Sequence, residues 1–580
     1  MPIKHPPRVR LVLRVGVTGH RPNRLVGADE ERLRESVQMT LALIRQEVLA
    51  VLHAYRDFFS EQDPRLCLIS PLAEGADRIV AQEALHLGYQ VLSPFPFNIA
   101  EYTNDFATIA SKEEFQKLAS QSSTLFQLDG DRNNSNRAYD TLGATILKFT
   151  DLLVTIWDGS QSRGPGGTAE VVRRAIELGI PTIQISARPP HAVSLLNSPS
   201  NNLVSAEIRE HLEYILLPGS EAEAASVLRF QNERQPKWNF ALPFKIFCKI
   251  WVPQWPNPTI RVRDFDQEAE IGAQEWKRLP KMEDIATQIE ENFLSIFSWA
   301  DGLAATYADR YRSSFTATYL LAALATMLAF GGLLSGKTTF FASELVLLFM
   351  ILSITVISLR RQWRKRWMDY RLLAEGLRHA ALLVPLGTVS SFMQVRSLNP
   401  STGRRWFNCY LRPLFLNAHM NLSTLTSYRS MLQQAIDDQE RYHARNRLRM
   451  SKLHHRLQRT ALLLFWIAAL GCLLNLLPSS LPLDSKFHSL LERITALWLV
   501  TLPSLAVALI AIDRQGEIEQ TALRSHAMGL RLKQLANTLR TLQPGADSET
   551  LRRIALNFSE LCRLEIDDLY LAFERILTPL

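Results

Sequence analysis

The chain has 580 residues, of which 47% are hydrophobic and 21% are charged, and its formal net charge is +8. A chain of this length is too long for one compact core, and its composition is not that of a disordered polymer. Its five cysteines lie far apart, which indicates neither a disulfide scaffold nor a zinc site, so we expect no metal. The basic residues cluster beside apolar segments, which predicts a lipid bilayer as a partner and no direct contact with nucleic acid. The first ten residues, MPIKHPPRVR, lack the apolar stretch of a cleaved secretion signal, so we expect a cytosolic N-terminal half.

Residues 1–186 alternate short apolar runs with helical patterns. The predicted strands are 10–20, 65–70, 89–97, 152–158 and 180–186, and the predicted helices are 31–55, 75–88, 138–151 and 168–179. Such alternation predicts an α/β domain with a doubly wound, Rossmann-like parallel sheet that helices cover on both faces. Residues 187–282, which are rich in proline and tryptophan in places, are predicted to be a connector.

In a doubly wound sheet, ligands bind beyond the carboxyl ends of the strands. Three of the four loops that follow predicted strands combine small residues with a charge. Gly75 and the pair Gly166–Gly167 open helices whose unpaired N–H groups suit a phosphate. One glycine pair is more often a turn, but four such loops at one edge favour a nucleotide-like ligand, with His20 and Arg21 best placed for its phosphates. The candidate ligand-binding residues are Thr18, Gly19, His20, Arg21, Gly75, Ala76, Asp77, Arg78, Pro94, Asp158, Gly159, Gly164, Gly166, Gly167, Thr168 and Glu170.

Four apolar stretches in the second half are long enough to cross a bilayer as helices. They form two hairpins, one in residues 283–400 with spans at about 314–335 and 340–359, and one in residues 401–580 with spans at about 460–482 and 494–512. A long polar helix is predicted before each hairpin, either to carry motion into the membrane or to serve only as an oligomerisation stalk. Basic flanks at 360–366 and 441–459 predict the inner membrane with both chain ends cytosolic.

The two hairpin regions resemble each other. The sequence AEGLR begins at Ala374 and AMGLR at Ala527, each 15 residues after the last apolar residue of its hairpin, Leu359 or Ile512. This spacing predicts a duplicated unit of a hairpin and a following helix, with cytosolic helices at the end of the chain. Because four helices alone cannot enclose an aqueous path, we expect a homo-oligomer.

Several segments of the first third, in their order and spacing, are similar to a known superfamily. VGVTGHR, PLAEGADRIVAQEALHLGYQVLSPFPF, EYTNDF and VTIWDGSQSRGPGGTAEVVRRA resemble the SLOG superfamily, which includes LOG phosphoribohydrolases, the DNA-processing protein DprA and the ligand-sensing region of melastatin-type TRP channels. The hairpin region resembles, less specifically, the SLATT type of two-helix membrane effector. Together these resemblances imply a sensor of a nucleotide-derived messenger that opens a pore or disrupts the membrane in bacterial antiviral defence.

The enzymes of that superfamily carry a PGGxGTxxE signature in which the glutamate serves chemistry. In this chain the spacing is shortened to GPGGTAE, which places Glu170 where an acid also simply complements a helix dipole. Backbone amides do not depend on that spacing, so a ligand cradle remains expected, without a catalytic cofactor. Two alternatives stay open: a membrane-tethered nucleotide hydrolase that uses Glu170 with Arg21 or Arg78, and a passive membrane anchor that assembles partners through its stalks.

Overall fold

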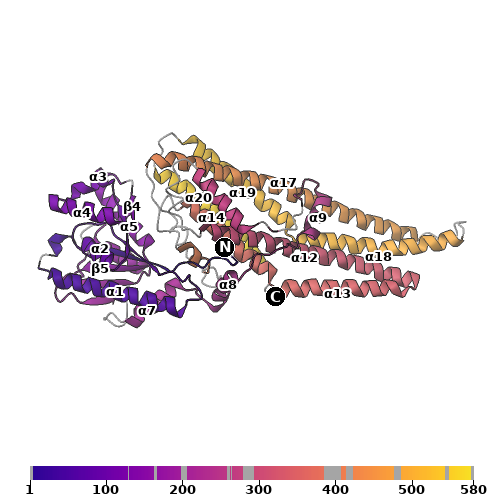
Figure 1. Ribbon diagram of the computed structural model, residues 1–580. Helices are drawn as coiled ribbons and strands as arrows, with labels where there is room; N and C mark the ends of the chain where they lie inside the picture. The colour runs from indigo at the N-terminus through magenta and orange to yellow at the C-terminus, as the bar shows by residue number, and fades with distance from the viewer. Residues whose placement is uncertain are drawn as a thin grey trace.

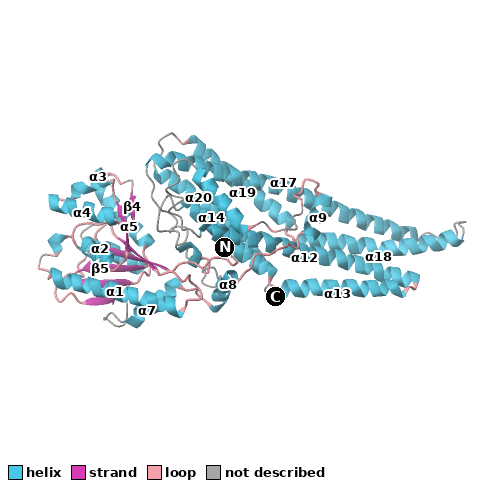
Figure 2. Cartoon of the chain, viewed as in Figure 1, coloured by secondary structure: helices cyan, strands magenta, loops and turns pink. Residues whose placement is uncertain are grey.

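The structure is a computed structural model. It describes residues 4–25, 27–128, 130–161, 166–196, 205–257, 262, 264–278, 293–383, 406–412, 422–475, 485–542 and 548–575. An α/β domain lies at one end of the molecule and a bundle of long helices extends from it at the other (Figures 1 and 2). The predicted fold class is therefore confirmed.

The α/β domain contains one seven-stranded sheet in the order β4-β3-β2-β1-β5-β6-β7. Strands β1 to β6 are parallel, and β7 pairs with β6 in the antiparallel direction. The strands are β1 Val12–Gly19, β2 Arg65–Ile69, β3 Gln90–Phe95, β4 Thr124–Gln127, β5 Leu152–Trp157, β6 Thr182–Ser186 and β7 Val193–Leu196. The central strands are buried along almost their whole length because helices cover both faces of the sheet.

The helices of this domain follow the strands as a doubly wound fold requires. They are α1 Glu30–Ala54, α2 Ala76–His86, α3 Ile99–Tyr102, α4 Ile109–Gln121, α5 Ser135–Phe149, α6 Thr168–Glu177 and α7 Ser205–Leu216. Helix α1 packs against α2 and α7, α2 packs against α4, and α5 packs against α6. The sequence pattern predicted five of the seven strands but neither β4 nor α4, since β4 has four residues and α4 buries only Phe115, Leu118 and Ala119.

The predicted connector at 187–282 is largely folded. Its first part belongs to the α/β domain, because β7 extends the sheet and α7 packs on α1. The remaining helices are α8 Glu221–Gln231, α9 Leu242–Trp251 and α10 Phe265–Arg278, of which α9 and α10 pack against the first long helix of the bundle. Several apolar residues of the predicted linker, among them Phe244, Phe247 and Phe265, are therefore buried against the bundle.

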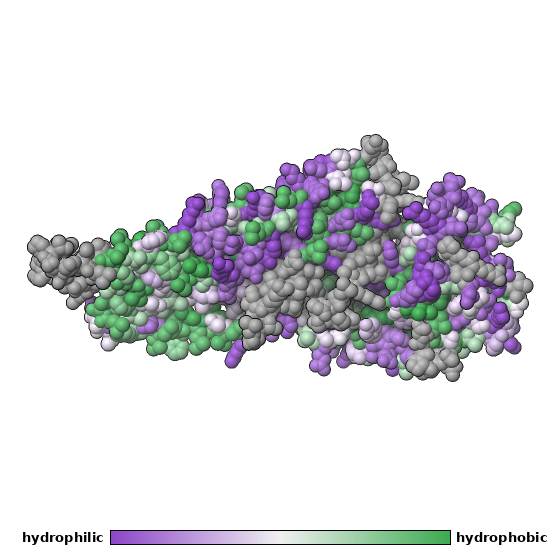
Figure 3. All heavy atoms as spheres, turned by 180° about the vertical axis from the view of Figure 1, so that it is seen from behind, coloured by the Kyte–Doolittle hydropathy of each residue, from purple (hydrophilic) through white to green (hydrophobic). Residues whose placement is uncertain are grey.

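The bundle confirms four helices that are long and apolar enough to cross a membrane. Its helices are α12 Phe293–Ser335, α13 Thr338–Arg360, α14 Trp363–Leu383, α16 Asn408–Leu411, α17 Leu422–Asn475, α18 Ser485–Gln515, α19 Ile518–Thr541 and α20 Ser548–Arg575. Each polar stalk continues directly into the following span, as α12 and α17 show, whereas residues 476–482 of the third predicted span lie outside the described residues. Hydrophobic side chains cover the far end of the bundle, around the spans (Figure 3).

The two hairpins have the same internal arrangement. Helix α12 packs against α13 and α14, α17 packs against α18 and α19, and α12 also contacts α18. Each span that returns from the hairpin tip ends in a two-residue break whose second residue is left-handed, Gln362 with φ 49° and Glu517 with φ 48°. A non-glycine residue rarely adopts this conformation, so its recurrence at both breaks supports the predicted duplication.

Candidate functional site

The candidate site lies where the strand order reverses, between β1 and β5. The chain leaves β1 toward β2 and leaves β5 toward β6, so a crevice is expected beyond the carboxyl ends of this pair. His20 follows β1 and Asp158 follows β5, and His20 Nε2 lies 2.8 Å from Asp158 Oδ1 across the strand pair. The structure therefore brings together two residues that the sequence placed on separate loops.

The loops at the carboxyl ends of the strands form the edge of this crevice, which we call the rim. Short contacts hold these loops to one another. Gly75 has a φ of 92°, and a Cβ there would lie 2.7 Å from the carbonyl oxygen of His20. The amide of Ala76 donates to that same oxygen at 3.1 Å. On the other side, the hydroxyl of Thr168 donates to the carbonyl of Gly19 at 2.9 Å. The glycine at 75 is thus required by its backbone conformation and by the close approach of the β1 loop.

Two helices begin at this rim without a side-chain cap. The first residue of α2 follows Gly75 and that of α6 follows Gly167, and neither cap makes a side-chain hydrogen bond. By contrast, Asp29 caps α1 and Thr108 caps α4. The amide of Ala76 already donates to His20, but the other N–H groups of an uncapped first turn and the positive end of the helix dipole favour an anion.

Arginines surround the same edge. The guanidinium of Arg21 is exposed and lies 5.8 Å from the centre of the Tyr139 ring. Arg24 donates to the Ser160 hydroxyl at 3.4 Å, and Arg188 lies 3.4 Å from Asp158 Oδ2. Hydrogen bonds from Ser160 and then His20 hold the pKa of Asp158 below its usual range, so this carboxylate stays charged near neutral pH.

A further group of rim residues was not among the predicted site residues. Asp105 accepts hydrogen bonds from Arg132 and from the hydroxyl of Tyr139, and the Arg132 guanidinium lies 4.8 Å from the centre of the Phe97 ring. Asp105 is part of the segment EYTNDF, which carried the family resemblance, so that segment was the available signal. Phe97, Asp105 and Arg132 lie between β3 and α5, whereas Tyr139 lies in the first turns of α5, where its ring contacts Arg21.

Several predicted site residues have other roles. Arg78 is buried and donates to the carbonyls of Leu72 and Ser111 and, at 2.7 Å, to the carboxylate of Glu114, so its charge serves the packing of α4 on α2. Pro94 lies inside β3, where it pairs with β4. Gly159 and Gly166 have positive φ angles at the rim, whereas Gly164 lies outside the described residues.

Asp77 is the unusual acid of the site. It lies in the first turn of α2, is 6% exposed, and its Oδ1 has no hydrogen-bond partner in the described part of the chain. Burial raises the pKa of Asp77 to about 7, although the positive charge of Arg21 opposes the shift. A neutral carboxyl at this helix start does not repel an anion and can donate a hydrogen bond to it.

Because the folded pKa of Asp77 exceeds the unfolded value, its neutral form stabilises the fold below about pH 4, and that contribution is lost as the pH rises through 7. The substitution Asp77→Asn is therefore expected to raise the free energy of unfolding at pH 8 by on the order of 4 kcal/mol and to flatten its decline between about pH 4 and 7. Urea unfolding in detergent at several pH values measures both effects. If the free energy of unfolding of the two proteins varied with pH in the same way, Asp77 would be ionised over the whole pH range measured.

Glu170 is held by neighbouring arginines. Its carboxylate lies 2.6 Å from Arg173 and 2.9 Å from Arg174, and the hydrogen bond from Arg173 leads the causes that lower its pKa. A carboxylate with a lowered pKa is a poor proton donor near neutral pH.

We expect the purified protein to hydrolyse AMP no faster than its Glu170→Gln variant does, which product analysis by chromatography checks. Turnover that this substitution abolishes would instead support the hydrolase alternative.

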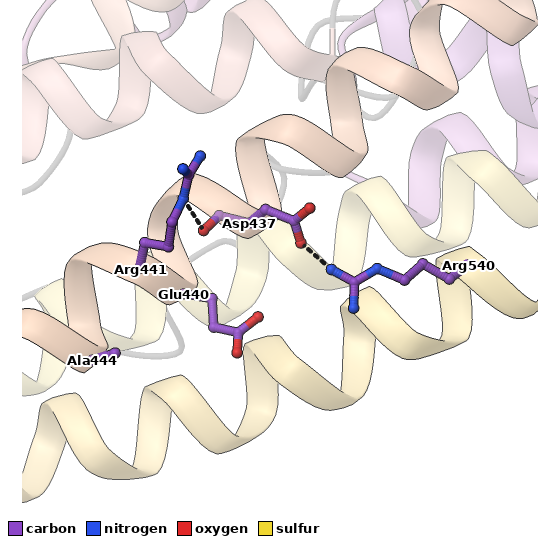
Figure 4. A pocket seen from close by; sticks show the side chains of 5 residues that line it. All are labelled: Asp437, Glu440, Arg441, Ala444 and Arg540. Carbon is purple, nitrogen blue, oxygen red and sulfur yellow. Dashed lines mark hydrogen bonds and ion pairs between the residues drawn. The ribbon is translucent and has the colours of Figure 1, made fainter.

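A hollow of about 440 Å³ lies elsewhere, between α17 and α19. Figure 4 shows that Asp437 faces Arg540 across it, with an ion pair of 2.7 Å, while Arg441 donates to the main chain of Asp437. These charges already compensate one another, so the hollow offers less to an anion than the rim of the sheet does. Its lining residues are Asp437, Glu440, Arg441, Ala444 and Arg540.

A buried acid joins the α/β domain to the bundle at the edge of the sheet opposite the rim. Asp151 directly precedes β5 and lies 2.7 Å from Arg14 and 2.8 Å from Arg412, which follows α16 between the two hairpins. The strands therefore begin beside the bundle and end at the candidate site, which faces away from it (Figure 1).

A second buried acid joins the connector to the first hairpin unit. Glu233, just after α8, accepts hydrogen bonds from Tyr307 of α12 at 3.0 Å and from Arg366 and Tyr370 of α14, both at 2.7 Å. Its carbonyl oxygen is 2.9 Å from the ring of His5 near the start of the chain. Glu233 thus joins the connector to two long helices through its carboxylate, and to His5 through its main-chain carbonyl.

Comparison with known proteins yields one family match. Residues 295–383 match the family described as "Protein of unknown function (DUF4231)". The matched segment coincides with α12, α13 and α14, the first hairpin unit. No curated protein matches the chain.

Proposed function

We propose that this protein is a membrane effector that binds a nucleotide-derived messenger at the rim of its sheet and responds by opening an oligomeric pore or disrupting the bilayer. The observation that carries the proposal is the pair of uncapped helix starts, α2 and α6, beside the exposed Arg21 at the point where the strand order reverses. Main-chain amides and a guanidinium supply donors for phosphate oxygens. The aromatic ring of Tyr139, next to Arg21, offers a surface for a base.

The buried junctions support a connection from this domain to the membrane. Asp151 links the first residues of β5 to the segment between the hairpins, and Glu233 links the connector to α12 and α14. The acids of both junctions are buried and paired with arginines, so these contacts hold the sheet against the bundle.

The position of the rim bears on how the signal is transmitted. A ligand on the edge that faces away from the bundle is accessible to a neighbouring copy of the chain, so binding favours assembly if two copies share the ligand or the ordered rim. A ligand shifts such an equilibrium only by the difference in its affinity for the two states. Helix α13 has no buried side chain in a single chain, which leaves its surface for lipid or for other copies.

The orientation in the membrane is part of the proposal. The exposed basic residues Arg360 and Arg361 follow the second span, and Arg456 and Arg459 precede the third. Positive flanks stay on the cytosolic side, so we place the α/β domain and both chain ends in the cytosol and the hairpin tips outside the inner membrane.

Arg21→Ala is expected to weaken binding of the messenger by about tenfold or more, because a charge-assisted hydrogen bond in a rim site is worth about 1.5–3 kcal/mol. Isothermal titration with AMP, ADP-ribose and cyclic di-AMP measures this on the full chain in detergent. Arg56→Ala is the matched control, since Arg56 is also exposed but precedes β2. If none of the three binds wild-type protein, or if both variants bind equally well, the rim is not a site for these nucleotides.

A further inference from the structure

Helix α9 is apolar on two sides. Phe244, Phe247 and Cys248 form its buried face, which packs against α12 and α17. On the other side Leu242, Ile246 and Ile250, spaced by four residues, are 37%, 47% and 69% exposed. Such a stripe exposed to water is unfavourable, and on a protein surface it marks a contact with another molecule or with lipid.

The position of α9 along the long axis of the bundle indicates what contacts its exposed apolar side. The amide of Phe244 lies 3.4 Å from the hydroxyl of Ser313, the first residue after the charged part of α12, and the ring centres of Phe244 and Phe315 are 6.4 Å apart. The carbonyl of Trp251, at the other end of α9, accepts a hydrogen bond from Arg456, four residues before the third span. Helix α9 therefore lies across the ends of the spans that face the α/β domain (Figure 1).

The surroundings of α9 have the composition of a membrane interface. Trp238 is exposed just before the helix and lies 6.0 Å from the guanidinium of Arg310, while Trp255 packs on Phe244 just after it. Lys249 is exposed next to Ile250. Tryptophan gathers at the level of lipid headgroups, and lysine and arginine there attract anionic lipids.

We propose that α9 is an interfacial helix whose Leu242, Ile246 and Ile250 insert into the headgroup region of the leaflet next to the α/β domain. The occupant of the stripe is lipid because α9 packs on α12 and α17 where their spans begin, and because the exposed Trp238 and Lys249 flank it. A second copy of the chain fits less well, since a stable dimer buries about 800 Å² on each partner, far more than three side chains on a ten-residue helix offer. The inference depends on the assignment of the spans and is independent of any ligand at the rim.

The test uses nitroxide labels on the full chain in vesicles of phosphatidylcholine and phosphatidylglycerol. Single cysteines replace Ile246 or Ile250 in a Cys409→Ser, Cys472→Ser background, which leaves only buried cysteines. Controls carry the label at Met39, exposed on α1, and at Leu352, exposed on α13. Collisions with oxygen, which dissolves in lipid, are compared with collisions with a water-soluble nickel chelate.

We expect the ratio of oxygen to nickel collisions at 246 and 250 to be several-fold higher than at 39 and to approach that at 352. A ratio equal to that at 39 would place the stripe in water and overturn the proposal. Protection from both reagents, together with spin–spin broadening, would show that a second copy covers the stripe, and this would overturn it as well.

Discussion

Replacing Glu233 with alanine is expected to lower the free energy of unfolding by about 3–5 kcal/mol, the usual cost of removing one partner from a buried charged network. The substitution leaves the Arg366 guanidinium without its buried carboxylate and removes the acceptor of the Tyr370 hydroxyl. It also separates the connector from α12 and α14, so the loss is expected in the bundle as well as in the α/β domain. Urea unfolding in detergent, followed by tryptophan fluorescence, measures the change.

Two further variants make this result specific to Glu233. Glu210→Ala removes an exposed glutamate of the neighbouring helix α7 and is expected to change stability by less than about 0.5 kcal/mol. Glu233→Gln keeps the volume and one acceptor, and is expected to lie between wild type and Glu233→Ala. Equal stability of wild type and Glu233→Ala would mean that the junction contributes nothing to the fold.

The second large effect is expected at Asp151. Asp151→Ala leaves the buried Arg14 and the half-buried Arg412 without their carboxylate, and the same argument predicts a loss of about 3–5 kcal/mol. Asp57→Ala, at an exposed position of the same domain, is the control and is expected to be neutral. Limited proteolysis adds a structural readout, since loss of the Arg412 contact is expected to expose residues 406–412 to cleavage.

The pH dependence distinguishes the ion pair from simple packing. Burial by itself raises the pKa of Asp151, but Arg14 and Arg412 outweigh it and hold the pKa below its usual value. A depressed carboxyl pKa gives stability that is present above the unfolded value, near pH 4, and is lost as the pH falls through the folded value. The difference between wild type and Asp151→Ala is therefore expected to shrink below pH 4. A difference that stays constant down to pH 2 would point to packing alone.

The sequence predicted those parts of the fold that depend on local patterns. Strands such as β1 and β5 are rich in buried apolar residues, and the spans are long uncharged stretches, so periodicity and length were sufficient. Strand β4 has only four residues, and α4 has a mostly polar sequence. The apolar pattern of neither can therefore be distinguished from that of an exposed loop. Helix α9 is short, and its place at the span ends depends on contacts with distant helices.

The candidate site likewise has parts that the sequence predicted and parts that depend on contacts between distant segments. The loops after β1, β2 and β5 were predicted because topology alone brings the ends of parallel strands together. Asp105, Arg132 and Tyr139 were missed because their convergence depends on β4. Arg78 was predicted to face the ligand, yet its direction is set by Glu114 on α4. The junctions of Asp151 and Glu233 join residues far apart in the chain, and no local pattern predicts such pairs.

The central claim is that a nucleotide at the rim controls the membrane hairpins. The most direct test is release of an entrapped dye from vesicles that contain the full chain, with AMP, ADP-ribose and cyclic di-AMP added in turn, and with Arg21→Ala vesicles in parallel. The account predicts that a nucleotide that binds wild-type protein releases the dye, and that Arg21→Ala needs about tenfold more of it. Tight binding of such a nucleotide without any release, or equal release with and without it, would contradict the account.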